Sequence, residues 1–359
     1  MIKRVIALAI CLVCLLSILP LSACTGEIPS AGDTTGGGNT NIQPKNRLWY
    51  EYFDTISIAY DYSGMTNAEF DKITDLIEDE LKTCHELYDI YNEYSGINNL
   101  ATLNKNAGGK EIKVDSRIID LLTFSKEMYD TTGGEVNIAM GAVLVLWHDA
   151  RVAANKNPQN AKIPDMAALT EASLHTDISS IVVDKENCTV KITDPKARID
   201  VGAIAKGYTA ERIAKMLIDR GVTSFVLDLG GNLRVIGTKA DGNGWNTGIR
   251  NPLHDPDNPY VRTVVLKNSS LVTSGTYERF FTVDGVKYHH IIDADTLMPS
   301  NRYASVSIHT ESSAVADALS TAVFNMTEDE INALVQRIPD VEITVIDTAG
   351  NMTIYGARK

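Results

Sequence analysis

The stretch Ile199–Gly221, "IDVGAIAKGYTAERIAKMLIDRG", predicts the end of a strand, a tight turn and then a helix. The apolar side chains after the turn recur at helical spacing, with Ile213, Met216 and Leu217 on one face. A glycine at position 221 ends the pattern, as is common just after a helix. Small residues in such a turn let a ligand approach the backbone closely, so we ask what binds there.

The turn itself carries Asp200, Gly202, Ala203, Lys206 and Gly207. A helix N-terminus presents free N–H groups and positive potential to phosphate, and Lys206 adds a full charge there. Asp200 can accept a hydrogen bond from a ligand N–H or hydroxyl group. The lysine precedes the second glycine, so the turn is not a Walker A loop. The pattern fits a phosphate-bearing ligand and, equally well, a tight strand–helix turn with a solvated lysine.

The N-terminus predicts a lipoprotein signal. Two cations precede about 15 mostly apolar residues, too few to span a bilayer comfortably but typical of a signal-peptide core. The segment ends in "LSAC", which resembles a lipobox and implies cleavage after residues 1–23 and acylation of Cys24. An ordinary signal peptide with a chance cysteine is the alternative. Several acyl chains on Cys24 would hold the protein stably on an extracytoplasmic membrane surface, on the plasma membrane's outer face or the periplasmic side.

Residues 24–46 predict a flexible tether that begins at the acylated cysteine. They contain three consecutive glycines with Ser, Thr, Asn and Pro, and too few apolar groups to pack. The remaining residues 47–359 are long enough to bury a substantial core, in one large domain or two intimate ones.

The net charge and the cysteines limit which partners, metals and disulfides the protein can have. The net charge of −13 argues against nucleic acid and against electrostatic adhesion to anionic lipid, so membrane binding should depend on the anchor. Cys84 and Cys188 are the cysteines that remain after processing, and we expect two buried thiols rather than a disulfide. After the expected signal peptide, which contains Cys11 and Cys14, no Cys-x-x-Cys or His-x-x-x-His spacing indicates zinc or haem.

The periodicity predicts an α+β fold. Thr66 with Glu69 and Thr327 with Glu330 form capping boxes at two helix starts, and Ser116 is predicted to cap a third helix. Because strands outnumber what simple βαβ repetition would give, we favour this class over a doubly wound sheet. Strand or hairpin patterns occur in residues 50–62, 180–192, 224–237, 261–275, 302–310 and 342–356.

Asp317 and Thr321 lie four residues apart in the apolar helical pattern of residues 312–326, so they share a face. A carboxylate and a hydroxyl are hard oxygen ligands, and Mg²⁺ is usually bound by few protein groups plus substrate oxygens. The alternative is a buried aspartate that accepts a hydrogen bond from the threonine or caps a neighbour. His289 and His290 alternate faces of a predicted strand, so one can be buried against the site and the other exposed; by themselves they are a weak signal.

Four segments, taken together and in this order, resemble the ApbE family of FAD:protein FMN transferases, and the resemblance extends from "FDTISI" to the end of the chain. It implies an ApbE-like (T-fold-like) α+β fold of mixed sheets with packed helices and a nucleotide site between them. The segments are "IDVGAIAKGYTAERIAKMLIDRGV" (199–222), "LDLGGNLRVIG" (227–237), "SGTYERFFTVDGVKYHHIID" (274–293) and "ADALSTAVF" (316–324).

The resemblance also implies an activity. Such an enzyme moves the FMN moiety of FAD, with Mg²⁺, onto a Thr or Ser hydroxyl of a target flavoprotein and releases AMP. Its targets are typically subunits of membrane redox complexes of the Rnf and Nqr types. Two alternatives stay open: a Mg²⁺-dependent FAD pyrophosphatase that gives FMN and AMP, and a non-catalytic FAD-binding lipoprotein.

The family's site residues carry over by motif. Its metal ligands match the Ala203 carbonyl and the Asp317 and Thr321 side chains, and His290 is the candidate base, with a structural histidine as the alternative. Tyr91 matches an aromatic that stacks on a ring, and residues 138–140 match a backbone wall. The expected FAD contacts are Phe53, Tyr91, Ile138, Ala139, Met140, Asp200, Lys206 and Ile292.

The chain departs from the family pattern at a few positions. Phe53 stands where methionine is common, and Asn137 where aspartate is common. Ala294 and Leu297 replace a proline and a glycine after Ile292, which alters the turn expected beside the nucleotide. None of the expected metal ligands is changed, so we expect an active enzyme.

Overall fold

The computed structural model describes residues 44–358. The expected signal peptide, Cys24 and nearly all of the tether lie outside the described residues. Strand β1 (Lys45–Trp49) begins inside the expected tether, so the folded part starts before residue 47. In residues 44–358 no helix is both long and apolar enough to cross a membrane.

A single antiparallel sheet of eight strands organises the domain, and every neighbouring pair in it is antiparallel. This arrangement bears out the predicted α+β class, since a doubly wound fold would need parallel strands. In spatial order the strands are β1, β2 (Ser57–Asp61), β6 (Ser224–Leu229), β7 (Asn232–Gly237), β10 (Ser270–Gly275), β13 (Tyr303–Thr310), β14 (Glu342–Asp347) and β15 (Met352–Gly356).

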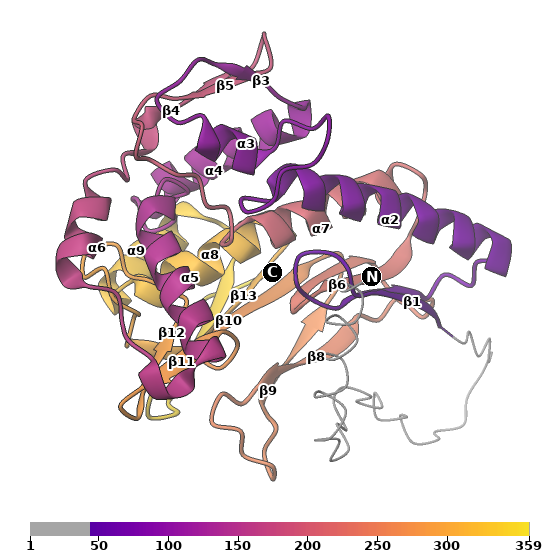
Figure 1. Cartoon of the computed structure of the whole chain (residues 1–359). Coiled ribbons are helices and arrows are strands. Elements are labelled where there is room, and N and C mark those ends of the chain that lie inside the picture. The colour runs from indigo at the N-terminus through magenta and orange to yellow at the C-terminus, as the bar shows by residue number, and fades with distance from the viewer. Residues whose placement is uncertain (1–43, 359) are drawn as a thin grey trace, which may run out of the picture. The chain divides into compact units, whose positions relative to one another are not determined.

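Helices cover one face of this sheet. Helix α7 (Ala205–Ile218) packs on β6 and β7, and α8 (Ser313–Asn325) packs on β10 and β13 (Figure 1). The long α2 (Asn67–Tyr88) lies against α7 and β1, with Ile77 and Leu81 fully buried, each contributing about 1.5–3 kcal/mol. Helix α9 (Glu328–Arg337) packs on β15 in the same layer, whereas α3 (Leu100–Lys105) and α4 (Ser116–Thr132) pack on α2 and on the strands β5 and β4.

The other face of the sheet is covered in part by a hairpin of β8 (Trp245–Arg250) and β9 (Tyr260–Leu266). Successive side chains of β6 point to opposite faces of the sheet, so Phe225 packs with α2 and α7 whereas Val226 packs with the hairpin. Two smaller sheets complete the fold: β3 (Ile112–Lys113), β5 (Thr189–Ile192) and β4 (Ile181–Asp184) in one, and β11 (Phe280–Val283) and β12 (Val286–His289) in the other.

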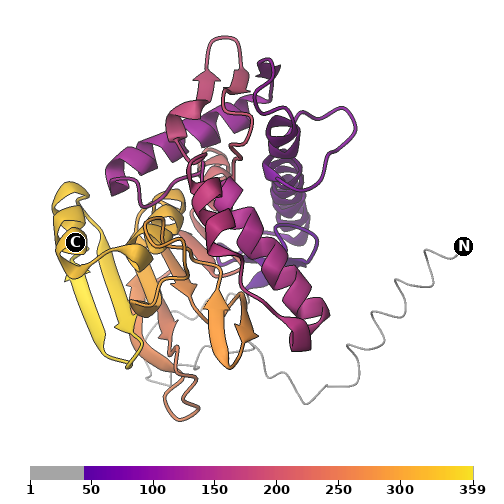
Figure 2. The same cartoon turned by 60° about the vertical axis from the view of Figure 1, so that its left-hand side comes forward.

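Helix α5 (Gly141–Lys156) follows α4 in the chain and packs against β11 and α6 (Met166–Ser173), as Figure 2 shows. Two single 3₁₀ turns, Pro158–Asn160 and Ile178–Ser180, connect the neighbouring segments. The sequence patterns above do not predict α5, which becomes important for the site.

Several local expectations are confirmed, and three are wrong. Both capping boxes are present. The cap of α4 is Asp115, which accepts a hydrogen bond from Arg117, and the predicted cap Ser116 is the first residue of the helix. The alternation in residues 50–62 yields a strand only at 57–61, since a turn occupies residues 51–55. Cys84 and Cys188 are free as expected, but Cys188 is only partly buried because it lies in the β4–β5 turn.

Candidate active site

A cleft of about 940 Å³ opens where α5, the turn into α7, β10, β12 and α8 meet. All of the predicted contact residues in the described part of the chain line this cleft, except Ala139. Ala139 is fully buried, and its N–H donates to Oδ1 of Asn137, so it turns away from the cleft and supports the wall from behind.

The motif turn and helix α8 meet at Gly207. Its N–H donates to Oδ2 of Asp317 over 2.8 Å, and Asp317 is only 4% exposed. A Cβ at position 207 would lie closer than 3.0 Å to the Ser313 carbonyl and to Cβ of Asp317. Only glycine allows α7 and α8 to approach this closely, and the approach orients the carboxylate.

The turn before α7 also leaves a carbonyl free. Residue 203 precedes the helix, and the cap carbonyl that accepts the Tyr208 N–H is that of Ile204. No hydrogen bond in residues 44–358 reaches the Ala203 carbonyl. The Thr321 hydroxyl likewise makes no hydrogen bond in the described part of the chain, and both residues line the cleft.

These groups form an oxygen-lined corner. Oδ1 of Asp317 lies 3.9 Å from Nζ of Lys206, while Oδ2 is held by Gly207. A carboxylate, a hydroxyl and a free carbonyl are the hard donors that Mg²⁺ prefers, and so few protein ligands leave positions for substrate oxygens. Within residues 44–358 no group of three His, Cys, Asp or Glu side chains could hold a metal by itself. The residues present therefore fit a Mg²⁺ ion that is completed by its substrate.

One buried ion pair and one hydrogen bond to the same carboxylate hold α7 and α8 together. Arg234 of β7 is 2% exposed, and its Nε lies 3.1 Å from Oε2 of Glu211 on α7. The same carboxylate oxygen accepts the Ser313 N–H at the start of α8 over 2.9 Å. One carboxylate therefore links β7, α7 and α8 beside the oxygen-lined corner.

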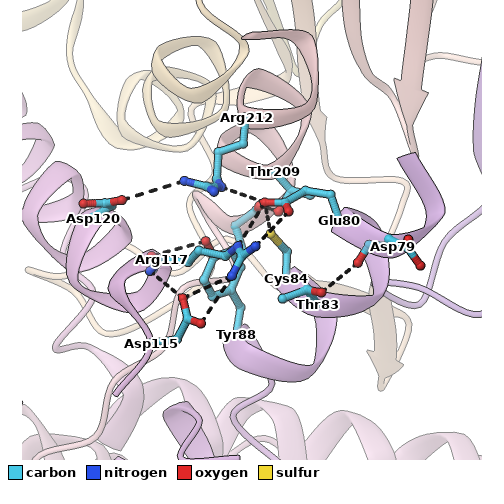
Figure 3. A network of polar contacts seen from close by, with 11 residues as sticks. Asp79, Glu80, Thr83, Cys84, Tyr88, Asp115, Arg117, Asp120, Thr209 and Arg212 are labelled. Carbon is cyan, nitrogen blue, oxygen red and sulfur yellow. Dashed lines mark hydrogen bonds and ion pairs between the residues drawn. The ribbon is translucent and has the colours of Figure 1, made fainter. Parts of the chain in front are cut away.

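A second network fixes α7 from the outside. Figure 3 shows Glu80 of α2 between Arg117 of α4 and Arg212 of α7, with Nε···Oε1 distances of 3.2 and 3.0 Å. Burial alone would raise the pKa of Glu80, but the hydrogen bonds from the two guanidinium groups outweigh it and lower this pKa. Burial raises the pKa of the neighbouring Cys84 to about 12, so this thiol is inert.

Two loops that line the cleft are joined through His85. Its Nδ1 accepts the N–H of Phe53 at 3.2 Å, so the proton resides on Nε2, which faces the Tyr94 hydroxyl at 3.4 Å. That hydroxyl donates to Oδ2 of Asp89, whose Oδ1 accepts the N–H of Tyr91. Phe53 and Tyr91 thus come from separate loops but are held by one hydrogen-bond chain.

The two histidines differ as their alternation predicts. His289 is buried, and its Nε2 lies 2.7 Å from the Ser300 carbonyl, which is a structural contact. His290 faces the cleft, and its Nδ1 lies 3.2 Å from the Arg279 carbonyl. Since a carbonyl only accepts, Nδ1 carries the proton and Nε2 keeps its lone pair. Desolvation by the surrounding protein, and then the charge of Arg279, lower the pKa of His290 to about 3, so it is a neutral acceptor.

Four further residues of the cleft were not anticipated. His148 and Arg151 come from α5 and are three residues apart, a spacing that places them on one face of the helix and could have marked them. Arg279 precedes β11, and Glu135 lies three residues before the wall at residues 138–140. Burial, followed by the charge of Glu330, raises the pKa of Glu135 to about 7. No single-sequence signal distinguishes Glu135 from a surface acid.

Asp200 lies between these groups and the turn. Burial raises its pKa, although the Gly202 N–H at 2.8 Å and the positive charge of Arg279 oppose this effect. A carboxylate in this position is available to accept hydrogen bonds from a ligand N–H or hydroxyl, as its place in the motif predicts.

Fold and site together define an antiparallel α+β domain with an open, nucleotide-sized cleft beside a carboxylate–hydroxyl pair. The model of the ApbE family matches residues 54–345 of this chain. The FAD:protein FMN transferase of Treponema pallidum is 36% identical over 261 residues, which cover 69% of this chain and 70% of that protein. The FAD:protein FMN transferase of Vibrio cholerae is 25% identical over 342 residues, 94% of each chain.

A solved structure agrees with these relatives. The crystal structure of the ApbE protein of Thermotoga maritima superposes with a TM-score of 0.74 at 27% identity, covering 87% of this chain and 96% of that one. The chain therefore belongs to the ApbE family, and the resemblance seen in its motifs is confirmed.

Proposed function

We propose that this protein is an FAD:protein FMN transferase, which uses Mg²⁺ to move the FMN moiety of FAD onto a Thr or Ser hydroxyl of a target flavoprotein and releases AMP. Its relatives of known name are FAD:protein FMN transferases. The observation that carries the proposal is the oxygen-lined corner of Asp317, Thr321 and the free Ala203 carbonyl, which lies beside Lys206 in the cleft.

The need for a cation follows from charge. The N-terminus of α7 attracts anions, but the Asp317 carboxylate already accepts one of its first N–H groups. A diphosphate in this corner would meet that negative charge at close range. The Asp317 carboxylate would hold a divalent cation here, whose charge would offset this repulsion, and we therefore assign Mg²⁺ to this place.

Each residue then has a defined task. Lys206 supplies positive charge beside the phosphates, and Gly207 holds the carboxylate of Asp317 in one orientation. The bound Mg²⁺ would supply Lewis-acid polarisation of the phosphate oxygens. His290, neutral and with a free Nε2, is placed in the cleft to accept the proton of the acceptor hydroxyl.

Every bond and proton in the proposed transfer is accounted for. The acceptor oxygen forms a bond to the phosphorus of the FMN moiety, and the bond from that phosphorus to the bridging oxygen breaks. AMP leaves with the bridging oxygen and its electron pair, while the hydroxyl proton passes to His290. Because the nucleophile comes from the partner protein, the chain needs no nucleophile of its own.

The direct test mixes the purified protein with FAD, Mg²⁺ and a candidate acceptor, followed by intact-mass spectrometry. We expect an FMN adduct on the acceptor with equimolar AMP, and no adduct with Asp317→Ala or without Mg²⁺. Rapid AMP release without any adduct would indicate the pyrophosphatase. Intact bound FAD after incubation would indicate a carrier.

The location and targets follow from the N-terminus and the chemistry. We propose that Cys24 is acylated and anchors the domain outside the cytoplasm, since the segment before it resembles a lipobox. Flavoprotein subunits of membrane redox complexes of the Rnf or Nqr type are the proposed acceptors, because a lipid-anchored enzyme shares their surface. Labelling with radioactive palmitate, in the native chain and in Cys24→Ala, tests the anchor.

A further inference from the structure

An exposed aromatic ring stands in the cleft with one side supported. Tyr91 is 55% exposed and lines the cleft, and its backbone N–H donates to Oδ1 of Asp89 over 2.7 Å. The Asp89 carboxylate also accepts hydrogen bonds from Asn92 and Tyr94, so the loop that carries Tyr91 has a fixed course. A large aromatic surface left open in a binding cleft is suited to a planar ligand.

The supporting group is His148 of α5. Its ring stacks on Tyr91 with centroids 4.7 Å apart and an interplanar angle of 28°. The Tyr91 hydroxyl also lies 3.1 Å from Nδ1 of His148. Within residues 44–358 His148 is the only ring stacked on Tyr91, so the opposite face of the tyrosine remains available.

The protonation of His148 is set by its neighbours. A guanidinium nitrogen of Arg151 lies 3.4 Å from the same Nδ1, and a guanidinium only donates. With the Tyr91 hydroxyl as a second donor, Nδ1 must carry the lone pair and Nε2 the proton. Burial, followed by the charge of Arg151, lowers the pKa of His148, so the neutral ring persists at neutral pH.

Two arginines give the cleft around the stacked Tyr91 and His148 rings a positive charge. Arg151 and Arg279 both line the cleft, and neither forms an ion pair with a carboxylate in the described part of the chain. The isoalloxazine ring of FAD is planar and electron-rich at its two carbonyl groups. Such a ring offers Tyr91 a stacking surface and offers the guanidinium groups hydrogen-bond acceptors.

We propose that His148, held by Arg151, is a positioning residue that fixes Tyr91 as the platform for the isoalloxazine ring of FAD. The inference rests on the proposed function, which supplies FAD as the ligand. The family resemblance implies stacking on Tyr91 alone; the assignment of His148 and its fixed tautomer comes from the geometry of this chain. His148 acts through Tyr91 and does not take part in bond breaking.

The test compares two ligands that share the adenylate end. FAD and AMP are each titrated against the native protein and His148→Ala, by calorimetry and, for FAD, by quenching of flavin fluorescence. We expect His148→Ala to weaken FAD binding about fivefold to twentyfold. The bound FAD should also fluoresce more strongly, whereas AMP affinity should stay within twofold.

Two substitutions separate the ring from the hydrogen bond. His148→Phe keeps a stacking ring and removes the acceptor, and His148→Asn keeps an acceptor near Nδ1 and removes the ring. We expect both to fall between the native protein and His148→Ala in FAD affinity and quenching. Asp149→Ala, an exposed neighbour on α5 that does not line the cleft, is the matched control and should match the native protein.

The results that overturn the inference are specific. The inference is wrong if His148→Ala binds FAD and quenches its fluorescence as the native protein does. It is also wrong if His148→Ala loses affinity for FAD and for AMP equally. If the His148 variants fail to fold, Tyr91→Phe, which keeps His148 but loses the hydroxyl contact, must show the raised fluorescence. Neither titration needs an acceptor, so a native protein that forms no FMN adduct would refute the proposed transfer and leave this test intact.

Discussion

Replacing Gly207 with alanine tests the link between helix packing and the metal site. The added Cβ would lie closer than 3.0 Å to the Ser313 carbonyl and to Cβ of Asp317, and 3.1 Å from Oδ1 of Asn232. Two of these contacts involve backbone or a Cβ atom, which cannot rotate away. Helix α8 must therefore move away from α7, and the Gly207 N–H to Asp317 hydrogen bond must lengthen or break.

The expected magnitudes follow from these contacts. Overpacking of this kind costs about 1–3 kcal/mol, and a lost hydrogen bond to a carboxylate costs about 1.5–3 kcal/mol. The higher helix propensity of alanine stabilises the variant by about 1 kcal/mol. The net loss of about 1.5–5 kcal/mol should lower Tm by roughly 2–8 °C in a domain of this size. A carboxylate displaced by about 1 Å should lower kcat/KM about 100-fold and raise the Mg²⁺ concentration needed for half-maximal rate.

The assay measures AMP release and FMN adduct formation against Mg²⁺ concentration, with Tm from calorimetry. Gly202→Ala is the matched contrast, because its Cβ would meet only the flexible Asp200 carboxylate at 3.1 Å. We expect this variant to keep a native-like Mg²⁺ requirement. A Gly207→Ala protein with native Tm and an unchanged Mg²⁺ requirement would refute the argument that glycine is needed for helix approach.

Three further predictions concern charged groups. Glu135→Gln should leave the free energy of unfolding unchanged near pH 4.5 and raise it above pH 7. The pKa of Glu135 in the folded state, about 7, exceeds its ordinary value of 4.5, so the native protein loses stability as the pH rises between these values. Allowing for partial exposure, the gain at pH 8 is about 2 kcal/mol by thermal unfolding. His290→Gln should slow adduct formation about 10²–10⁴-fold with little change in FAD affinity. Since the pKa of His290 is about 3, kcat/KM of the native protein should not fall through protonation of His290 between pH 8 and 5. Glu80→Gln should lower stability by about 2–3 kcal/mol, because Arg117 and Arg212 lose the carboxylate between them, and a native Tm would contradict this.

The parts of the fold that could be predicted are those fixed by local rules. The capping boxes at Thr66 and Thr327 depend on neighbouring residues alone, and the structure reproduces them. Strand β13 also forms where its pattern predicts a strand, although every residue in it is buried. The segment at residues 50–56 failed because its alternation is overridden by tertiary contacts. Phe53 and Asp54 adopt φ angles of 56° and 51°, and the backbone of Phe53 is held by His85, far away in the chain.

The residues of the candidate site likewise differ in whether local sequence predicts them. The spacing of Asp317 and Thr321 on one helical face was readable, because a single turn of helix sets it. The approach of His148 to Tyr91 was not, since it depends on how α5 packs beside the loop after α2. Arg279 and Glu135 carry no local pattern and gain meaning only from the cleft that they line.

The glycine of the motif turn has a different physical role from the one its sequence indicates. Small residues at a helix start are usually explained by the approach of a phosphate, but the space beside Gly207 is filled by Ser313 and Asp317 of α8. The helix N-terminus thus binds a protein carboxylate first. A carboxylate held there turns its second oxygen toward Lys206 and would repel a bare diphosphate. Both effects agree with the proposed divalent cation, and the missing side chain at Gly207 is what lets α8 bring the carboxylate into this orientation.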